Sequence, residues 1–433
     1  MKKVNLLYGR DGMTLNMPSG TDVLQGQTIP ALSNCAGAVV DALNRPIGSA
    51  PLQALLAAKR PATVAITISD ITRPVPNKVF MPHLLGVLNG SGIADSQIVI
   101  IIGTGMHRPS TLEERDILLG AEILQRIEVV DHMSDRPETL VRVCDDPPVS
   151  LCRRFNDADF KIVTGLIEPH FMAGFSGGRK GVCPALVDLK TIENFHSYKT
   201  LANPHAENGV LETNPCHEIS LKIAKRVGVD FLFNVAITKG REMAGIYCGD
   251  LEKAHLAGCD EVARWTTAQV DKCYDLVVTN GGGYPLDQTF YQTTKGMCTA
   301  LPALGEHSTL LIASHCGEQI GSREFKELML KYNNNWTLFL DDLALQTDEI
   351  MLDQWAFQMQ TRVLERIGLK NLWFVSDGIN GQLQEKLSVH PISGTDSVQQ
   401  RMQQAIDRFV ADQPTAQIAI IPEGPYTLLK RKR

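Results

Sequence analysis

Short apolar runs alternate with longer amphipathic segments along most of the chain. A continuous apolar run is typical of a strand buried on both faces of a parallel sheet, and an amphipathic segment is typical of a helix that covers such a sheet. The alternation therefore predicts an α/β fold with mainly parallel sheets flanked by helices. In the first part of the chain it predicts strands at 62–69, 97–102, 126–131, 160–167 and 230–238, and helices at 52–59, 78–90, 111–120, 215–227 and 251–267.

A second set of strands and helices begins after residue 273. We place a boundary near 268–273 and predict two domains, an N-terminal domain over 1–270 and a C-terminal domain over 274–410. The last apolar run, within 412–433, can return to either sheet, and the chain opens with a hairpin-like pair of strands at 4–8 and 13–17. The second domain is predicted to hold strands at 274–279, 308–314, 371–376 and 416–421, and helices at 323–332, 353–368 and 396–410.

Polar side chains follow several predicted strands at the points where those strands end. Asp70 and Arg73 come directly after one strand, and His107 follows the next strand through a Gly-Thr-Gly turn. His170 follows a third strand. Open α/β sheets bind their ligands at the carboxyl ends of the strands. The pattern therefore predicts an active site at these ends, in the cleft between the two domains.

The loop at 168–180 is rich in glycine and ends in Arg179 and Lys180. Glycines let backbone N–H groups approach an anion closely, and the two cations add positive charge beside them. The spacing is not that of a phosphate-binding Walker A loop, because no Ser or Thr follows the lysine. The loop is therefore either a cradle for an anion or cofactor of another kind, or a glycine-rich turn with a surface Arg-Lys pair.

Two histidines on separate strand ends suit a reaction in which a proton is handled on either face of one substrate carbon. The ordinary pKa of histidine, about 6.5, lets it give and accept protons near neutrality. Arg73 and Lys295 suit an anionic substrate or a cofactor phosphate. The residues alone thus predict an enzyme with two bases, an anion site and a cradle for a nucleotide-like group, and they do not name the cofactor.

The composition is that of an ordinary globular protein, with 44% apolar and 21% charged residues among 433. The formal net charge of −6 does not favour a nucleic-acid or membrane partner. We find no apolar run of transmembrane length and no secretory segment after the first residues. The ten cysteines include no C-x-x-C pair, which fits the reducing cytoplasm better than a disulfide scaffold or a zinc ribbon.

Several longer motifs occur in a fixed order along about two thirds of the chain. The first are Tyr-Gly-Arg-x-Gly at 8–12, Ser-Asp-Ile-Thr-Arg-Pro at 69–74 and Gly-Thr-Gly-x-His-Arg at 103–108. They are followed by Glu-Pro-His-Phe-x-Ala-Gly-Phe-Ser-Gly-Gly-Arg-Lys at 168–180, His-Ser at 196–197 and Gly-Gly-Tyr-Pro-x-Asp-Gln…Tyr-Gln-x-x-Lys at 282–295. In these motifs the chain resembles the nickel-pincer lactate racemases, the LarA-like 2-hydroxy-acid racemases and epimerases.

The resemblance implies a cofactor, a pyridinium-3,5-bisthiocarboxylate mononucleotide whose sulfur arms hold Ni(II) in a pincer. His196 falls at the position of the family's nickel-binding histidine, and imidazole suits nickel as a ligand. Lys180 falls where the cofactor can be tethered covalently. The segment that matches the family's cofactor contacts consists of Asp70, Ile71, Thr72 and Arg73.

The resemblance also implies a reaction, inversion at C2 of a 2-hydroxy acid. His107 and His170 match the two acid/base histidines of the family. One of them removes the hydroxyl proton while the α-hydride moves to the cofactor. Return of the hydride to the other face of the planar 2-keto acid, with the opposite histidine acting, inverts the centre. The residues that match substrate contacts are Arg73, Tyr291, Gln292 and Lys295.

Two other classes of protein share some of these features. A nicotinamide-dependent 2-hydroxy-acid dehydrogenase predicts a G-x-G-x-x-G turn, which this sequence does not contain. A non-catalytic two-lobed carboxylate-binding protein needs neither paired histidines nor a metal. The resemblance implies the enzymes of cofactor synthesis as partners. It leaves open both a homodimer and the choice of 2-hydroxy acid.

Overall fold

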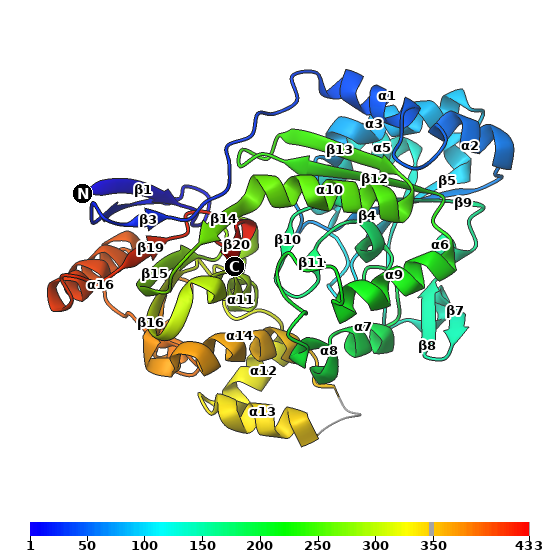
Figure 1. The fold of residues 1–433 in the computed structure, drawn as a ribbon. Coiled ribbons are helices and arrows are strands. Elements are labelled where there is room, and N and C mark those ends of the chain that lie inside the picture. The colour runs from blue at the N-terminus through cyan, green and yellow to red at the C-terminus, as the bar shows by residue number, and fades with distance from the viewer. Residues whose placement is uncertain (346–349, 433) are drawn as a thin grey trace.

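Two six-stranded sheets form the framework of the molecule (Figure 1). The computed structural model describes residues 1–345 and 350–432. All neighbouring strands in both sheets are parallel except β13, which pairs antiparallel with β12. The first sheet has the order β13 (Met243–Gly249), β12 (Phe231–Ile237), β9 (Phe160–Leu166), β4 (Val64–Ser69), β5 (Ile98–Gly103) and β6 (Glu128–Asp131). The second has the order β18 (His390–Pro391), β17 (Leu372–Val375), β16 (Leu304–Ala313), β15 (Tyr274–Asn280), β19 (Ile418–Ile420) and β3 (Asp22–Val23).

The strands of the first sheet are buried on both faces, which is why they read as continuous apolar runs. In β4, Val64, Ile66 and Ile68 pack into one hydrophobic cluster, while Ala65 packs into another on the opposite face. The first cluster is covered by helices α1 (Cys35–Asn44), α2 (Leu52–Lys59), α3 (Asn77–Gly90) and α4 (Leu112–Leu119), and the second includes residues of α9 (Pro215–Val227) and α10 (Leu251–Thr266).

The second sheet is likewise covered on both faces. Helices α11 (Phe290–Thr299) and α14 (Gln354–Ile367) lie against the face that looks toward the first domain. The opposite face packs against α16 (Val398–Asp412) and against the N-terminal hairpin of β1 (Lys2–Leu6) and β2 (Met13–Met17). The α/β class with mainly parallel, helix-flanked sheets is therefore confirmed.

The predicted helix at 111–120 and strand at 126–131 differ in detail from the structure. Gly120 adopts a φ of 82°, ends α4 and starts a second short helix, α5 (Ala121–Arg126). The following strand β6 is correspondingly short. The apolar residues of this segment fit a helix as well as a strand, so the pattern alone could not place the change.

The two ends of the chain both join the second domain. The N-terminal hairpin shares a hydrophobic cluster with β15, β16 and α16, and β3 pairs with β19. From the sequence, these first residues were predicted to belong to an N-terminal domain over 1–270. The structure instead pairs them with a strand almost four hundred residues further along the chain. Strand β19 joins the second sheet, and β20 (Leu428–Arg431) pairs with β14 (Thr267–Val270) at the junction of the domains.

Helix α12 (Arg323–Tyr332) was predicted with these bounds. Other helices were not predicted, among them α1, α7 (Leu189–Phe195), α8 (Tyr198–Ala202) and α13 (Trp336–Leu345). All ten cysteines are free thiols. Among residues 1–345 and 350–432, no helix combines the length and apolar character needed to cross a membrane.

Leu15, on the N-terminal hairpin, is fully buried in the second-domain cluster. We expect Leu15→Ala to lower the free energy of unfolding by about 2–5 kcal/mol, because it removes buried methyl groups and leaves a cavity. Urea denaturation followed by tryptophan fluorescence measures the change. Leu112→Ala, at a side chain that is 82% exposed, is the control and should shift stability by less than about 0.5 kcal/mol. Equal effects of the two substitutions would contradict the assignment of the hairpin to this core.

Candidate active site

One cavity lies where the carboxyl ends of β4, β5 and β9 face helices α11 and α14 of the second domain. It encloses about 1080 Å³, counting its open mouth. Of the predicted site residues, Ile71 does not line the cavity and instead packs against the core of the first domain. The other predicted site residues all line it, namely Asp70, Thr72, Arg73, His107, His170, Lys180, His196, Tyr291, Gln292 and Lys295.

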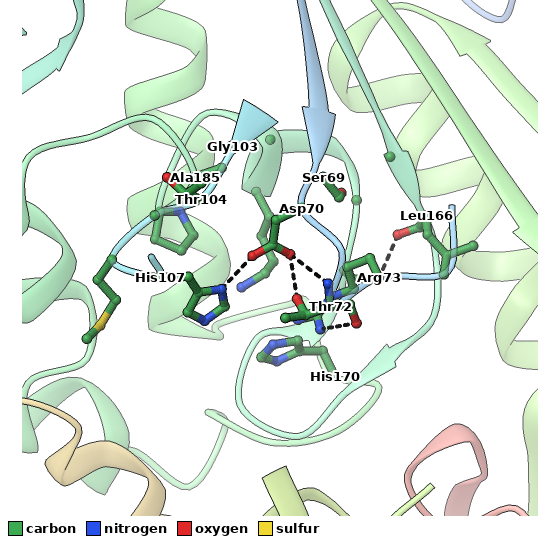
Figure 2. A pocket seen from close by; sticks show the side chains of 18 of the residues that line it. Ser69, Asp70, Thr72, Arg73, Gly103, Thr104, His107, Leu166, His170 and Ala185 are labelled. Atoms are coloured by element: carbon green, nitrogen blue, oxygen red, sulfur yellow. Dashed lines mark hydrogen bonds and ion pairs between the residues drawn. The ribbon is translucent and has the colours of Figure 1, made fainter. Parts of the chain in front are cut away.

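Asp70 holds His107 by one ring nitrogen. The Asp70 carboxylate lies 2.6 Å from His107 Nδ1, and its other oxygen accepts hydrogen bonds from the backbone N–H and the hydroxyl of Thr72 at 3.2 and 2.5 Å (Figure 2). Burial alone would raise the pKa of Asp70, but the His107 ring, the Thr72 hydroxyl and Arg73 outweigh it and lower that pKa. Asp70 is therefore an anion that binds Nδ1–H, which directs the lone pair of His107 to Nε2.

His170 is held in the opposite way. Its Nδ1 accepts the backbone N–H groups of Met172 and Ala173 at 3.4 and 3.2 Å, so the neutral ring carries its proton on Nε2. Burial lowers the pKa of His170 well below its ordinary value, and the charges of Lys180 and Lys295 lower it further. The two histidines at this cavity thus rest in different tautomers.

The glycine-rich loop is folded back on itself by Ser176. The backbone N–H of Ser176 donates to the carbonyl oxygen of Glu168 at 2.9 Å, and its hydroxyl donates to that of Leu166 at 2.7 Å. Gly178 adopts a φ of 55°, and its N–H donates to Asn234 Oδ1 at 2.7 Å. A Cβ on Gly178 would lie only 2.4 Å from the His255 ring, so glycine is required there by packing.

Arg179 and Lys180 have different surroundings. The Arg179 guanidinium is 1% exposed and donates to the carbonyl oxygens of Phe175 and Ala173 at 2.9 and 2.7 Å. It therefore holds the loop from inside, and the alternative of a surface Arg-Lys pair is wrong. Lys180 lines the cavity, where burial first, and then the charges of Arg179 and Arg73, lower its pKa to about 7.

His196 presents one ring nitrogen to the cavity. It follows the last residue of α7, and its Nδ1–H donates to the carbonyl oxygen of Ile192 at 2.8 Å. That bond leaves the lone pair on Nε2. Burial lowers the pKa of His196 to about 3, with a further contribution from Lys180. The ring is therefore a neutral donor of the kind that a transition-metal ion binds.

Helix α11 carries the second domain's contribution. Tyr291, Gln292 and Lys295 lie on one face of this helix, because residues three and four apart are neighbours on a helix surface. The side-chain amide oxygen of Gln292, Oε1, is buried and has no hydrogen-bond partner among the residues that the structure describes. Burial lowers the pKa of Lys295 well below its ordinary value, the charge of Arg73 lowers it further, and the carboxylate of Glu168 opposes both. The helix therefore brings an amine with a lowered pKa and an unpartnered amide oxygen to the wall of the cavity.

Sequence comparison shows the family of the chain. Residues 8–209 match the model of the lactate racemase N-terminal domain, and residues 270–428 match that of the lactate racemase C-terminal domain. A lactate racemase of Thermoanaerobacterium thermosaccharolyticum is 30% identical over 445 residues, covering 100% of both chains. A lactate racemase of Lactiplantibacillus plantarum is 32% identical over 397 residues, covering 90% of each.

The chain belongs to the lactate racemase family. It is accordingly an isomerase of the racemase class. The solved structure of the lactate racemase apoprotein from T. thermosaccharolyticum superimposes with a TM-score of 0.88 at 28% identity, over 99% of this chain and 100% of that one. A Thermotoga maritima protein shares the fold, with a TM-score of 0.66 at 15% identity over 92% of this chain and 97% of its own.

Two residues of this racemase-family site were not assigned roles from the sequence. Glu168 places a carboxylate oxygen 3.7 Å from Arg73 Nε. It is the first residue of the glycine-rich motif, in which the sequence suggested chemistry only for His170, Arg179 and Lys180. Trp355, which the sequence left open as core or substrate contact, lines the cavity and stacks on His196. Neither contact has a local sequence signal, because each joins segments that meet only in the folded chain.

Several histidines buried in a neutral state should make the stability of this protein fall in acid. The pKa of His132 is lowered by burial to about 4, and that of His196 to about 3. Unfolded histidine takes up a proton near pH 6.5, whereas the folded rings do so only below about pH 4. The contribution of these histidines is therefore expected to be constant above about pH 7. Each such histidine should lower the free energy of unfolding by up to about 1.4 kcal/mol per pH unit as the pH falls below about 6.5.

Urea denaturation between pH 7.5 and pH 5 measures this dependence. His132→Gln is the informative variant, because the glutamine amide can still donate to the Val187 carbonyl oxygen that His132 Nε2 contacts at 2.9 Å. In this variant the free energy of unfolding should fall less steeply with falling pH, by up to about 1.4 kcal/mol per pH unit, because one fewer proton is taken up on unfolding. An unchanged slope would show that His132 is protonated in the folded protein.

Proposed function

We propose that this enzyme racemises or epimerises C2 of a 2-hydroxy carboxylate with the help of a nickel-pincer nucleotide. The observation that carries the proposal is the placement of two histidines, His107 and His170, from different strand ends around one cavity with Arg73 and Lys295. Inversion at a carbon needs an acid/base group on each side of it and a binding contact that holds the rest of the substrate in one orientation. The names of the relatives, lactate racemases, agree with this class of substrate.

Arg73 and Lys295 are proposed to bind the substrate carboxylate. Both line the cavity, and the pKa of Lys295 is lowered first by burial and then by the positive charge of Arg73. A carboxylate placed between them would offset the charge of Arg73, favour the protonated amine of Lys295 and accept charge-assisted hydrogen bonds from both. The buried side-chain oxygen of Gln292, Oε1, has no partner among the described residues and is available to accept a hydrogen bond from the 2-hydroxyl group.

His107 is proposed to remove the hydroxyl proton. Asp70 binds its Nδ1–H at 2.6 Å, which leaves the Nε2 lone pair to accept a proton and stabilises the imidazolium that then forms. His170 acts from the other side. Its pKa is held down partly by Lys180, Lys295 and Arg73, so a bound substrate carboxylate would weaken that effect and make the ring easier to protonate.

The residues of the cavity fit the proposed cofactor. His196 offers Nε2 as a single metal ligand, and among residues 1–345 and 350–432 no group of three or more His, Cys, Asp and Glu side chains could hold a metal ion. The proposal gives His196 one coordination position and leaves the others to the cofactor. Lys180, with a pKa near 7, has the unprotonated amine that a covalent tether requires. When bound, the nickel-pincer nucleotide would supply the acceptor for the C2 hydride.

Removal of either acid/base histidine should abolish interconversion. We expect His107→Ala and His170→Ala, each in cofactor-loaded protein, to lower the rate by about 100-fold or more, because a positioned proton donor or acceptor contributes that much. A chirality assay against a panel of 2-hydroxy acids measures the rate, with nickel content determined in parallel. His307→Ala, at an exposed position on β16, is the control and should keep full activity. Full activity in either test variant would remove that histidine from the mechanism.

The fate of the hydrogen at C2 separates hydride transfer from proton abstraction. Racemisation of the protonated substrate in D₂O should give product without deuterium at C2, since a hydride that stays on the protein does not exchange with solvent. Mass spectrometry of the product at partial conversion measures the incorporation. Deuterium at C2 in step with inversion would instead indicate a carbanion route and would overturn the proposed mechanism.

A further inference from the structure

A tryptophan of the second domain lies flat against the histidine proposed to bind nickel. The rings of Trp355 and His196 are stacked, with centroids 4.3 Å apart and planes inclined by 23°. Trp355 belongs to α14, whereas His196 follows α7 of the first domain. Trp355 is 1% exposed and still lines the cavity, so one edge of this stacked pair faces the space proposed for the cofactor.

The indole is itself held firmly. Its Nε1–H donates to the hydroxyl oxygen of Tyr291 at 2.5 Å, which ties Trp355 to α11. It sits in the first turn of α14, just after Asp353, whose backbone has a left-handed φ of 64°. A buried aromatic ring with a satisfied polar group has little freedom to tilt.

Two other contacts also restrict the plane of the His196 ring. The bond from Nδ1 to the Ile192 carbonyl oxygen fixes one nitrogen but still allows the ring to tilt about that bond. Phe195 meets the ring edge-on, at 4.6 Å and 83°. Trp355 covers a face of the imidazole, so it limits the tilt that the other two contacts permit.

Two further side chains on the same face of α14 donate hydrogen bonds to the segment that follows His196. Gln358 donates to the Tyr198 carbonyl oxygen at 3.1 Å. Arg362 donates to the carbonyl oxygens of Asn203 and Ala206 at 3.0 and 2.9 Å. Residues 355, 358 and 362 are spaced by three and four, so they lie along one face of the helix. Figure 1 shows this helix beside α8, and the two elements are in contact.

We propose that Trp355 is a positioning residue, supplied by the second domain, that sets the plane of the His196 imidazole and hence the direction of its Nε2 lone pair. The consequence for nickel rests on the proposed function, in which His196 is the protein's metal ligand. Because the two rings come from different domains, the ligand is aligned only when the domains are docked. Alignment of this kind affects metal affinity by about 10- to 100-fold.

The alignment can be measured in protein without cofactor. In protein labelled at histidine ring carbons, His196 should give a ring-proton signal shifted upfield by the indole, assigned by its loss in His196→Gln. Trp355→Leu should remove the shift, while Trp355→Phe should retain an upfield shift because it keeps an aromatic face. Trp373→Leu is the matched control, since Trp373 lies 6.4 Å from the His390 ring, outside the cavity. It should leave the His196 signal unchanged.

Nickel content of protein purified from cells that make the cofactor gives the second measurement. Trp355→Leu should contain less nickel per protein than the parent, as an affinity about 10- to 100-fold lower would produce. Trp355→Phe should be closer to the parent protein in nickel content and Trp373→Leu equal to it. Urea midpoints identify any variant whose loss reflects unfolding, and in that case the Trp355→Phe result decides. An unshifted His196 signal in the parent protein, or Trp355→Leu with the parent shift and nickel content, would overturn the proposal. Full nickel in His196→Gln would instead overturn the proposed ligand, while the ring-proton shift would still report on Trp355.

Discussion

Crowding of positive charge in a buried space is the constraint on which this site depends. Arg73, Lys180 and Lys295 line one cavity, and Arg179 lies just behind it. Burial first, and then the neighbouring positive charges, lower the pKa values of Lys180 and Lys295. Two carboxylates offset part of this charge. Glu168 lies beside Arg73, and Asp70 contacts His107. Both lysines are therefore easier to deprotonate than a lysine at the surface, and an anion bound in this cavity would offset part of that effect.

The same crowding distinguishes two residues of identical chemistry. His107 contacts a carboxylate and remains partly exposed, whereas His170 is buried among cations and contacts backbone N–H groups. Their surroundings, and not their residue type, determine which nitrogen carries a proton. An anionic ligand changes the field around His170 more than that around His107, because His170 is the ring whose pKa the cations lower.

The framework of the fold was predictable because buried parallel strands are continuous apolar runs, as at 62–69 and 160–167. Asp70, Arg73, His107 and His170 were predictable because they follow those strands, whereas His196, Tyr291 and Gln292 were assigned roles only through the family resemblance. All of these residues line one cavity, and Ile71 does not. The pairing of β3 with β19 and the stack of Trp355 on His196 were not predictable. Each depends on residues far apart in sequence, and neither Asp22–Val23 nor a lone tryptophan carries a local pattern. The burial of Arg179 was hidden for a similar reason, since its partners are backbone carbonyl oxygens.

The pairing of β3 with β19 also bears on how the chain is made. A ribosome releases the N-terminal hairpin and β3 first, followed by the whole first sheet, and releases β19 only near the end of translation. Every strand of the first sheet is available long before β3 meets its neighbour. Contacts between such distant segments form slowly because of the entropy of closing so large a loop. The second sheet therefore reaches its full width only after synthesis of nearly the entire polypeptide, and its early strand must wait with an unpaired edge until then.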